Sequence, residues 1–184
     1  MSDYMAAEIH IGGKICRSVA KALCEVIAAA GASLEWGGGQ FHPKTPDELH
    51  LARSANNGGP LLLKLYDDQA RWGEFNTLER FLREHDIAYC RWSDGKYEYD
   101  PEGQAFHPDC GLVSWLTDHE RHPMVLVSHL TPIKDRLTKV LEFLKQSGAE
   151  TARVLTDIKK ATDCLCDELP PAVPSLETLE IVED

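Results

Sequence analysis

Two short stretches of this chain carry residue types suited to binding a charged ligand. Gly12, Gly13 and Lys14 lie between an expected strand and an expected helix. Backbone amides and a lysine at the start of a helix can hold an anion such as phosphate. The spacing fits neither the Walker nor the Rossmann glycine pattern. A tight turn with a solvated lysine is therefore the alternative that we favour.

Asp67 and Asp68 stand at the corresponding place, in the loop expected after a second strand. Adjacent carboxylates can hold a hard cation such as Mg²⁺. The alternative that we favour is a solvated loop whose charges stabilise the start of the next helix. The residues that the sequence offers for ligand binding are thus Gly12, Gly13, Lys14, Asp67 and Asp68. It predicts no catalytic residue, no metal site and no cofactor.

Four other side chains have the chemistry of zinc ligands. His107, Cys110, His119 and His122 follow the pattern H-x2-C-x8-H-x2-H, and imidazole and thiolate both bind Zn²⁺. The pattern lacks the paired cysteines of common structural zinc sites. An expected strand, rather than a ligand-presenting loop, also separates the two halves. We therefore favour loop histidines and an incidental thiol.

The six cysteines are scattered through the chain, which is typical of reduced thiols in a cytoplasmic protein. Cys164 and Cys166 resemble a chelating pair, but residues two apart on a helix project about 200° apart. Cys16 lies near a helix N-terminus and close to Lys14, two features that favour a reactive thiolate. No histidine can be assigned as its base, so a structural role is the interpretation that we favour.

Four tryptophans, Trp36, Trp72, Trp92 and Trp115, could line a ligand pocket. Trp36 and Trp92, however, end expected strands at equivalent places in a repeated pattern. This equivalence favours a repeated packing role over ligand recognition.

The repeated pattern is a strand–helix–strand unit that occurs twice. The offset between the copies grows only from 54 residues (Ile9 to Leu63) to 56 residues (Trp36 to Trp92). A drift of two residues within one loop is what a duplicated unit would show. The predicted elements are strands 8–11 and 33–36 around a helix 17–30 ended by Gly31, and strands 61–66 and 88–92 around a helix carrying Phe75, Leu78 and Leu82.

Turn residues and alternation predict the elements outside the two copies. A single helix through 111–120 fits less well than a strand, because Ser114 and Thr117 interrupt its apolar face. The predicted elements are a short return strand 40–42, a helix starting at Thr45 and Pro46, a breaker run 56–60, a hairpin strand 96–100, and strands 112–117 and 124–128.

From Pro132 onward the pattern becomes helical. One apolar stripe comprises Ile133, Leu137, Val140, Leu141 and Leu144, and a second comprises Leu155, Ile158, Thr162, Leu165 and Leu169. Two stripes joined across Ser147 and Gly148 predict an antiparallel helical hairpin. The residues after it form an acidic tail with prolines, in which Leu176, Leu179, Ile181 and Val182 are suited to docking.

Composition describes an ordinary globular chain. Its 184 residues are 43% hydrophobic and 27% charged, enough to bury a core without disulfides. Residues 1–10 show no signal-peptide pattern and no apolar run approaches bilayer length, so we expect a cytoplasmic protein without a membrane segment. The net charge is −11, but residues 167–184 hold six acidic side chains and no basic one. The remainder lacks a basic stripe, which argues against direct nucleic-acid binding.

The expected fold is α+β. Duplicated strand–helix–strand, ferredoxin-like halves would form one mainly antiparallel or mixed sheet with helices on one face, followed by a helical hairpin. We assign residues 1–130 to the duplicated domain, with repeat units at about 8–43 and 61–101. Residues 131–169 form the hairpin packed on it, and residues 170–184 the tail.

Three functional hypotheses follow. The one that we favour, because no positioned acid, base or nucleophile can be named, is a non-catalytic binding or protein-interaction module. It would contact a protein partner through the C-terminal helices and the acidic tail. The second is a small enzyme, with or without a metal, whose two strand-to-helix loops lie beside one concave pocket. The third is an acidic inhibitor of a basic nucleic-acid-binding partner, which requires a continuous acidic face across 94–109. The sequence predicts no oligomeric state.

Overall fold

The structure is a computed structural model that describes residues 4–55, 58–96, 99–146, 151–169 and 173–184. Contacts divide the chain into two units. The α+β unit comprises Met1–His122 and Val173–Asp184, and the helical unit comprises Pro123–Ala172. The helical unit is therefore an insertion, because the chain leaves the α+β unit after His122 and returns to it at Val173.

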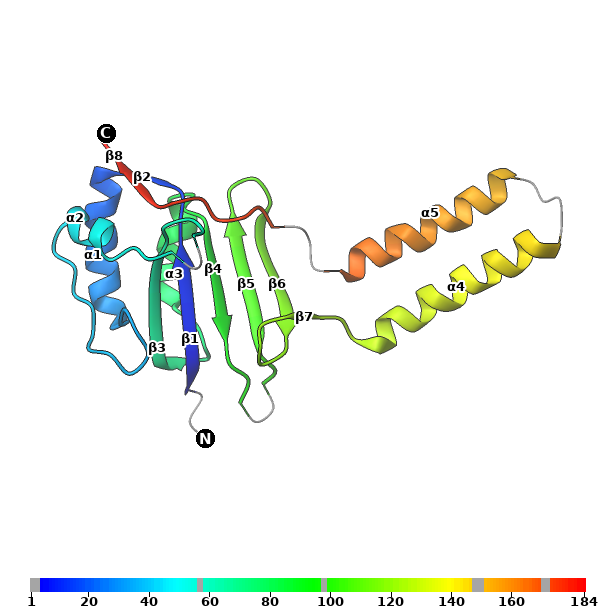
Figure 1. Cartoon of the computed structure of the whole chain (residues 1–184), viewed down its shortest axis with the longest axis horizontal. Helices are drawn as coiled ribbons and strands as arrows, with labels where there is room; N and C mark the ends of the chain where they lie inside the picture. Colours follow the sequence, from blue (N-terminus) through cyan, green and yellow to red (C-terminus); the bar gives the residue numbers. More distant parts are fainter. Residues whose placement is uncertain (1–3, 56–57, 97–98, 147–150, 170–172) are drawn as a thin grey trace. The chain divides into compact units, whose positions relative to one another are not determined.

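A six-stranded antiparallel sheet forms the frame of the fold (Figure 1). Its elements are β1 (Tyr4–Ile11), β3 (Leu63–Arg71), α3 (Asn76–Glu84), β4 (Tyr89–Ser93), β5 (Glu102–His107), β6 (Gly111–Thr117) and β7 (Pro123–Met124). The strand order is β3-β1-β4-β5-β6-β7. β1 lies between β3 and β4 and is antiparallel to both, so that β3, α3 and β4 form a split strand–helix–strand unit around β1.

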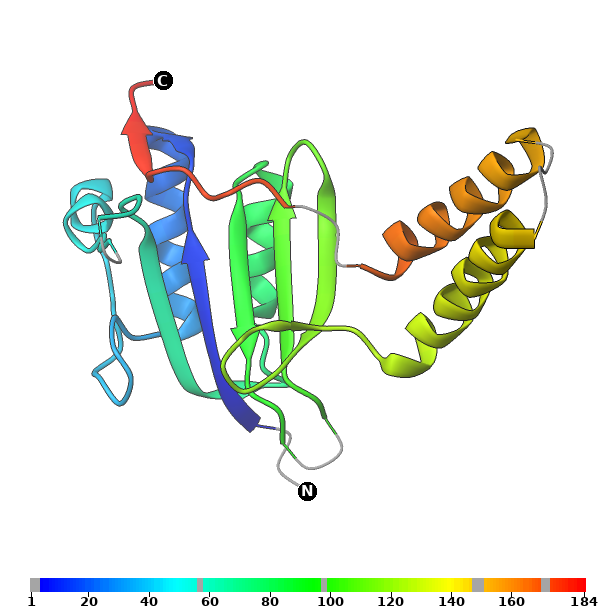
Figure 2. The same cartoon turned by 45° about the vertical axis from the view of Figure 1, so that its right-hand side comes forward.

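Helices α1 (Arg17–Ala30) and α3 contact each other and cover one face of the sheet (Figure 2). The bounds of α1 confirm the predicted helix 17–30, and Gly31 ends it with a left-handed φ of 71° that favours glycine. The apolar faces of both helices meet the sheet in one hydrophobic core. Its fully buried members include Ile9, Ile11, Leu23, Ile27, Leu78 and Leu82.

The short helix α2 (Pro46–Leu51) begins as predicted, with Thr45 at the N-cap position. The Glu48 carboxylate accepts hydrogen bonds from Lys44 N (3.1 Å) and Thr45 Oγ1 (3.2 Å). These bonds hold the start of the helix, while Leu49 is fully buried.

The first copy of the predicted repeat lacks its second strand. Residues 33–36 are not a strand, since only Ser33 makes isolated bridges, to Gln40 and Tyr66. The predicted return strand 40–42 is likewise reduced to the bridge at Gln40. The run Gly37–Gly39 turns the chain too early for a second strand to pair along its length.

Two further strands lie elsewhere than predicted. The partner of β4 in the hairpin is β5 at Glu102–His107, not 96–100; Lys96 and Tyr99 form only an isolated bridge, and 97–98 lie outside the described residues. The predicted strand 124–128 ends at Met124, because a helix begins at Val127. The predicted strand 112–117 is confirmed as β6.

The structure does not show the duplicated ferredoxin-like halves. α1 and α3 do pack together, but the two tryptophans that end the predicted copies have different surroundings. Trp36 is 43% exposed beside Tyr66, whereas Trp92 lies half-buried in β4 between His10 and Arg121. The similarity between the two stretches is therefore one of pattern, without matching structural roles.

Residues 173–184 belong to the α+β unit rather than forming a separate tail. β8 (Glu180–Val182) pairs in parallel with β2 (Lys14–Cys16), and Ile15 lies opposite Ile181. Leu179 is fully buried in the core, and its N donates to Leu61 O (2.8 Å). Asp184 Oδ1 accepts hydrogen bonds from Ser18 N (3.3 Å) and Ser18 Oγ (2.8 Å) in the first turn of α1. The aliphatic residues predicted to dock thus include one that completes the core of this same chain.

The helical unit contains the predicted pair of helices. They are α4 (Val127–Gln146) and α5 (Thr151–Glu168), which are in contact. α4 starts five residues earlier than the predicted Pro132, and the predicted break at Ser147 and Gly148 lies outside the described residues. Among the residues that the structure describes, none of the helices has the length and hydropathy to cross a membrane.

Replacing Leu179 by alanine tests whether β8 is part of the core. We expect Leu179→Ala to lower the free energy of unfolding by about 2–5 kcal/mol, because a fully buried side chain leaves a cavity. Glu183→Ala, at an 86% exposed side chain in the same segment, should change it by less than about 0.5 kcal/mol. Chemical denaturation measures both, and equal effects would contradict a core role for Leu179.

Candidate functional site

A cluster of charged and aromatic side chains lies on the sheet face opposite α1 and α3. Side chains alternate along β1, so that Glu8 and His10 point away from the helices. In register, Glu8 lies opposite Tyr66 of β3 and Trp92 of β4. Arg121 reaches this face from the loop after β6. We call these five residues the Glu8 cluster.

A bidentate ion pair between Glu8 and Arg121 is the centre of this cluster. The two guanidinium nitrogens of Arg121 each lie 2.6 Å from a carboxylate oxygen of Glu8, which is 4% exposed. The guanidinium carbon also lies 5.6 Å from the centroid of the Trp92 ring. Paired hydrogen bonds and the cation–π contact fix both distance and direction. The loop that carries Arg121 is therefore attached firmly to the sheet.

The surroundings of Glu8 favour its ionised form. Burial by itself would raise the pKa of Glu8, but contacts with His10 and Arg121 outweigh burial and hold the pKa below its usual value. His10 Nε2 lies 2.8 Å from Glu8 Oε1, and its ring meets that of Trp92 edge-on at 5.0 Å. Burial, with the Glu8 charge second, raises the pKa of Tyr66. The cluster is thus a buried carboxylate whose charge is balanced by the Arg121 guanidinium.

Cys90 lies opposite His10 on β4, which brings a thiol, an imidazole and the Glu8 carboxylate to one strand pair. That combination resembles the groups used in nucleophilic catalysis by cysteine. Burial, however, raises the pKa of the Cys90 thiol to about 12. The thiolate is the nucleophilic form, so burial disfavours the nucleophilic form of Cys90. The geometry supports a positioning role for the Glu8 cluster, which holds the loop after β6.

The central residues of this cluster were not predicted from the sequence. The available signal is the alternation of Glu8 and His10 with apolar residues in β1, which indicates two polar side chains on one face. Arg121 is 113 residues from Glu8, and no local pattern indicates their contact.

The loop that holds Arg121 also gathers three possible metal ligands. Asp118, Glu120 and His122 have ligand atoms within 4.8 Å of one another. Asp118 Oδ1 accepts hydrogen bonds from the backbone N of Glu120 (2.9 Å) and of His122 (2.8 Å). Hydrogen bonds from the side chain and backbone of His122 hold the pKa of Asp118 below its usual value. These bonds of the turn account for the closeness of the three groups, which are largely exposed.

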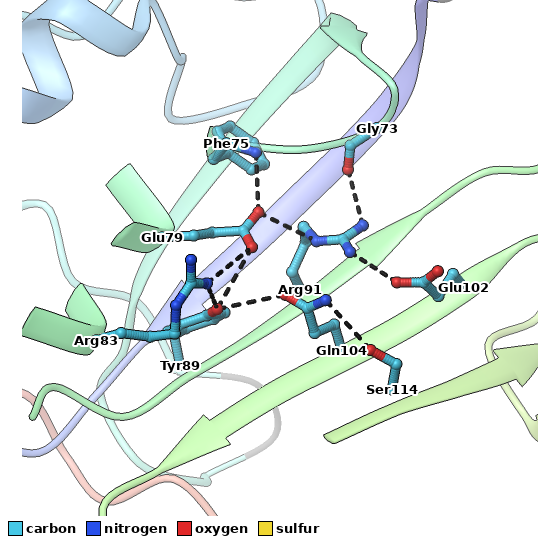
Figure 3. Close-up of polar contacts among 9 residues, drawn as sticks. All are labelled: Gly73, Phe75, Glu79, Arg83, Tyr89, Arg91, Glu102, Gln104 and Ser114. Atoms are coloured by element: carbon cyan, nitrogen blue, oxygen red, sulfur yellow. Dashed lines mark hydrogen bonds and ion pairs between the residues drawn. The ribbon is translucent and has the colours of Figure 1, made fainter. Parts of the chain in front are cut away.

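The helix-covered face of the sheet holds a buried polar network around Arg91 (Figure 3). Arg91 Nη1 donates to Gly73 O (2.8 Å) and Nη2 to Glu102 Oε1 (2.8 Å). Arg91 Nε lies 3.2 Å from Glu79 Oε1, which also accepts a hydrogen bond from Phe75 N (2.9 Å). One guanidinium thus joins the turn before α3, α3 itself and β5.

Tyr89 extends this network along β4 (Figure 3). Its hydroxyl accepts a hydrogen bond from Arg83 Nη1 (2.7 Å) and lies 3.3 Å from both Glu79 Oε2 and Gln104 Oε1. Burial, followed by the charge of Glu79, raises the pKa of Tyr89 to about 12. The network occupies the interior between α3 and the sheet, where it fastens the helix in place.

The backbone amides predicted to bind an anion already donate hydrogen bonds to carbonyl groups of this chain. Gly13 N donates to Glu177 O (3.1 Å). A Cβ added at Gly12 would lie 2.3 Å from the same carbonyl oxygen, so the close approach of the C-terminal segment requires glycine there. Lys14 lies in β2, with Nζ 4.0 Å from a carboxylate oxygen of Glu180.

Asp67 and Asp68 lie within β3, not in a strand-to-helix loop as predicted. Asp68 Oδ2 accepts a hydrogen bond from Gly37 N (2.9 Å). Asp67 lies opposite Ala7 within β1, whereas Gly12 follows Ile11 at the C-terminal end of that strand. The two predicted groups are thus separated along β1 by the residues between Ala7 and Gly12.

The four residues with zinc-ligand chemistry also do not converge. His107 and Cys110 lie at the turn before β6, and Cys110 N donates to His107 O (3.1 Å). His119 and His122 lie in the loop at the other end of β6. The predicted strand between the two pairs is confirmed, and it keeps them apart.

A hollow of about 340 Å³ opens between α4 and α5. Arg136 Nη1 donates a hydrogen bond to Cys164 Sγ (3.4 Å) at its wall, whereas Cys166 is exposed on another side of α5. The prediction that Cys164 and Cys166 face different ways is confirmed. Cys16 is half-buried at the N-cap position of α1. The hollow is lined by Ser128, His129, Pro132, Ile133, Arg136 and Cys164.

The four tryptophans lie in separate places. Trp36 and Trp72 each contact one tyrosine ring, with ring centroids 4.9 and 5.5 Å apart. Trp92 belongs to the Glu8 cluster. Trp115 covers Gly103 of the neighbouring strand so closely that an added Cβ would lie 2.4 Å from the indole. Trp36 and Trp92 thus do not share the packing role predicted for them.

The helical unit exposes a row of apolar side chains that we call the α5 stripe. Its members are Leu155, Ile158, Thr162, Leu165 and Leu169. Leu155, Ile158 and Leu169 are 59%, 37% and 44% exposed. The side of α5 that faces α4 is a different one, marked by Ala161, which is 1% exposed. Leu155, Ile158 and Leu169, predicted as part of the seam of the hairpin, are thus left exposed, whereas Leu165 is half-buried.

No protein-family model matches this chain, and neither a curated protein nor a solved structure is significantly similar to it.

Replacing Arg121 by glutamine tests the ion pair with Glu8. Because the folded-state pKa of Glu8 lies below its unfolded value of 4.5, the stabilisation is present above that pH and is lost on further acidification. We expect Arg121→Gln to lower the free energy of unfolding at neutral pH by about 1–3 kcal/mol and to flatten its decline in acid. Urea denaturation across this pH range measures both effects.

The matched control for this test is Arg80→Gln, which removes an exposed ion pair with Glu84 (3.9 Å). That variant should retain the acid dependence of the unmodified protein and lose less than about 1 kcal/mol. Parallel pH profiles for the unmodified protein and Arg121→Gln would contradict the role given to this pair.

The Tyr89 hydroxyl can be followed by its ultraviolet absorbance. Because the pKa of Tyr89 is raised to about 12, its hydroxyl should ionise at higher pH than the hydroxyls of exposed tyrosines. The free energy of unfolding that depends on the neutral hydroxyl is lost as the pH rises through the folded-state pKa of Tyr89. In rapid pH-jump measurements, Tyr89→Phe should abolish the last phase of tyrosinate absorbance. Tyr99→Phe, at a 41% exposed residue, should retain that phase; its loss in the control would refute the assignment.

Proposed function

We propose that this protein is a non-catalytic protein-interaction module whose helical unit carries the contact surface. The observation that supports the proposal is the α5 stripe. Its five members are spaced alternately three and four residues apart, which is the spacing of a coiled-coil seam. On an α-helix these positions lie within about 40° of one direction. They therefore form a continuous apolar row that a partner helix can cover.

The exposed aliphatic side chains described on α5 are confined to the stripe. Among the α5 side chains that the structure describes, the other exposed ones are Thr156, Lys159, Lys160, Asp163 and Cys166. Ala161 marks the side packed on α4, about a quarter-turn from the stripe. Two helices alone cannot bury both sides of α5. Covering each large aliphatic side chain would contribute about 1–2 kcal/mol, which is a substantial driving force for association.

The other two hypotheses receive less support from the geometry. The small-enzyme hypothesis requires the Lys14 and Asp67 segments at one pocket, yet Asp67 pairs with Ala7 within β1, whereas Lys14 lies beyond the end of β1 at Ile11. The inhibitor hypothesis requires a continuous acidic face across 94–109. Within that range Glu102 is engaged by the buried Arg91, so its charge is balanced internally. The acidic tail, the other predicted contact surface, is largely docked on α1 and β2.

A photo-reactive amino acid placed in the full chain tests the proposal. We expect p-benzoylphenylalanine at Ile158 to give a covalent adduct with another protein chain when cells producing the protein are irradiated. The same residue at Lys160, an exposed position off the stripe, should give little adduct. Mass spectrometry identifies the attachment sites. Absence of any adduct from Ile158, or adducts only with residues 4–122 of the same chain, would overturn the proposal.

A further inference from the structure

We propose that the hollow between α4 and α5 binds a small organic monocarboxylate, with its carboxylate on Arg136 and its apolar body against Ile133. The proposal goes beyond the interaction module, because the described residues that line the hollow do not belong to the α5 stripe. It is supported by the size of the hollow, by the charge of its lining and by the weak hydrogen bond that Arg136 makes there.

Small side chains on α5 account for the hollow. Ala161 packs against α4 and is 1% exposed, and Cys164, almost one turn further along the same side, forms the α5 wall. Side chains of this size leave unfilled a volume of about 340 Å³ that close-packed helices would otherwise occupy. Sites for small molecules start at about 300 Å³. The hollow therefore has room for a ligand of about ten non-hydrogen atoms.

The lining of the hollow combines a positive charge with an apolar floor. Arg136 is permanently charged, and none of the lining residues that the structure describes is acidic. Ile133, which is 7% exposed, lies almost one turn before Arg136 on the same side of α4. Ser128 and His129 add a hydroxyl group and an imidazole near the start of the helix. This arrangement complements a ligand with one negatively charged end and an apolar body.

Arg136 is held by a weak hydrogen bond that a carboxylate can supplement or replace. Its Nη1 donates to Cys164 Sγ (3.4 Å), which keeps the guanidinium at the wall of the hollow. A thiol sulfur is a weak acceptor, and the guanidinium has further N–H donors. A carboxylate accepts two parallel hydrogen bonds from a guanidinium, so it is a stronger partner than the thiol. Because the arginine side chain is already held, binding costs less side-chain entropy.

Titration of the isotope-labelled full chain with sodium benzoate, at constant ionic strength, tests the site by nuclear magnetic resonance. We expect saturable amide shifts within residues 128–136 and 161–165, with a dissociation constant of about 1 mM. Benzamide has the same shape without the charge, and inorganic phosphate has charge without the apolar body. Each should bind at least about tenfold more weakly than benzoate. Absence of saturable shifts in these segments, or equal affinity for either control compound, would overturn the proposal.

Two single substitutions on α4 separate a specific contact from the general charge of the helix. Arg136→Gln should raise the dissociation constant for benzoate at least about tenfold, because a bidentate charged contact is lost. Lys134→Gln removes the same charge from an exposed side chain outside the hollow and should change the constant less than about twofold. Circular dichroism checks that both variants keep their helices. An unchanged constant for folded Arg136→Gln would contradict the carboxylate contact.

The two cysteines of α5 report where benzoate binds. Cys164 lies at the wall of the hollow, whereas Cys166 is exposed on another side of the helix. With benzoate at about ten times its dissociation constant, alkylation of Cys164 by iodoacetamide should slow about tenfold, since most sites are occupied. The rate at Cys166 should change less than about twofold, and tandem mass spectrometry distinguishes the two thiols. Equal protection of both cysteines, or protection of neither, would place the bound benzoate elsewhere and refute the proposal.

Discussion

The buried guanidinium of Arg91 is the contact on which the α+β unit depends most. It is the largest of the fully buried side chains and binds Gly73, Glu79 and Glu102 at once. A buried cation is tolerated only where its charge and its donors are matched. The turn before α3, the helix and β5 must therefore be in place together. Burial of the apolar faces of α1 and α3 drives packing, and the contacts of Arg91 fix how α3 is placed on the sheet.

On the other face of the sheet, the buried carboxylate of Glu8 also holds two segments together through an ion pair. Its partner Arg121 precedes the point at which the chain enters the helical unit. Leu179 enters the core shortly after the chain returns from that unit. Both ends of the insertion are thus anchored in the α+β unit, one by an ion pair and the other by apolar burial. The contact surface that we propose would thus lie on an insertion that is joined to the α+β unit at two points.

Local patterns predicted the elements that depend on local forces. The bounds of α1 with its stop at Gly31, the apolar face of α3, and β6 all follow from periodicity and turn residues. Long-range contacts were out of reach, as for Arg121 with Glu8 and Ile15 with Ile181. Asp67 and Asp68 belong to β3 because β1 pairs with them, although their own residue type favours a loop. Periodicity also found the α5 stripe, but it could not indicate that α4 would pack on the side of Ala161 instead.

The parallel pairing of β2 with β8 has a consequence for biosynthesis. Ile15 and Ile181 are partners across nearly the whole chain, so their contact requires the closure of a very long loop. While the ribosome is still adding residues, the first turn of α1 has no access to the carboxylate that later caps it. The edge of β2 is exposed during the same interval. Formation of the complete native core is thus delayed until the residues around Leu179 emerge, and earlier folding intermediates expose apolar surface that is buried later.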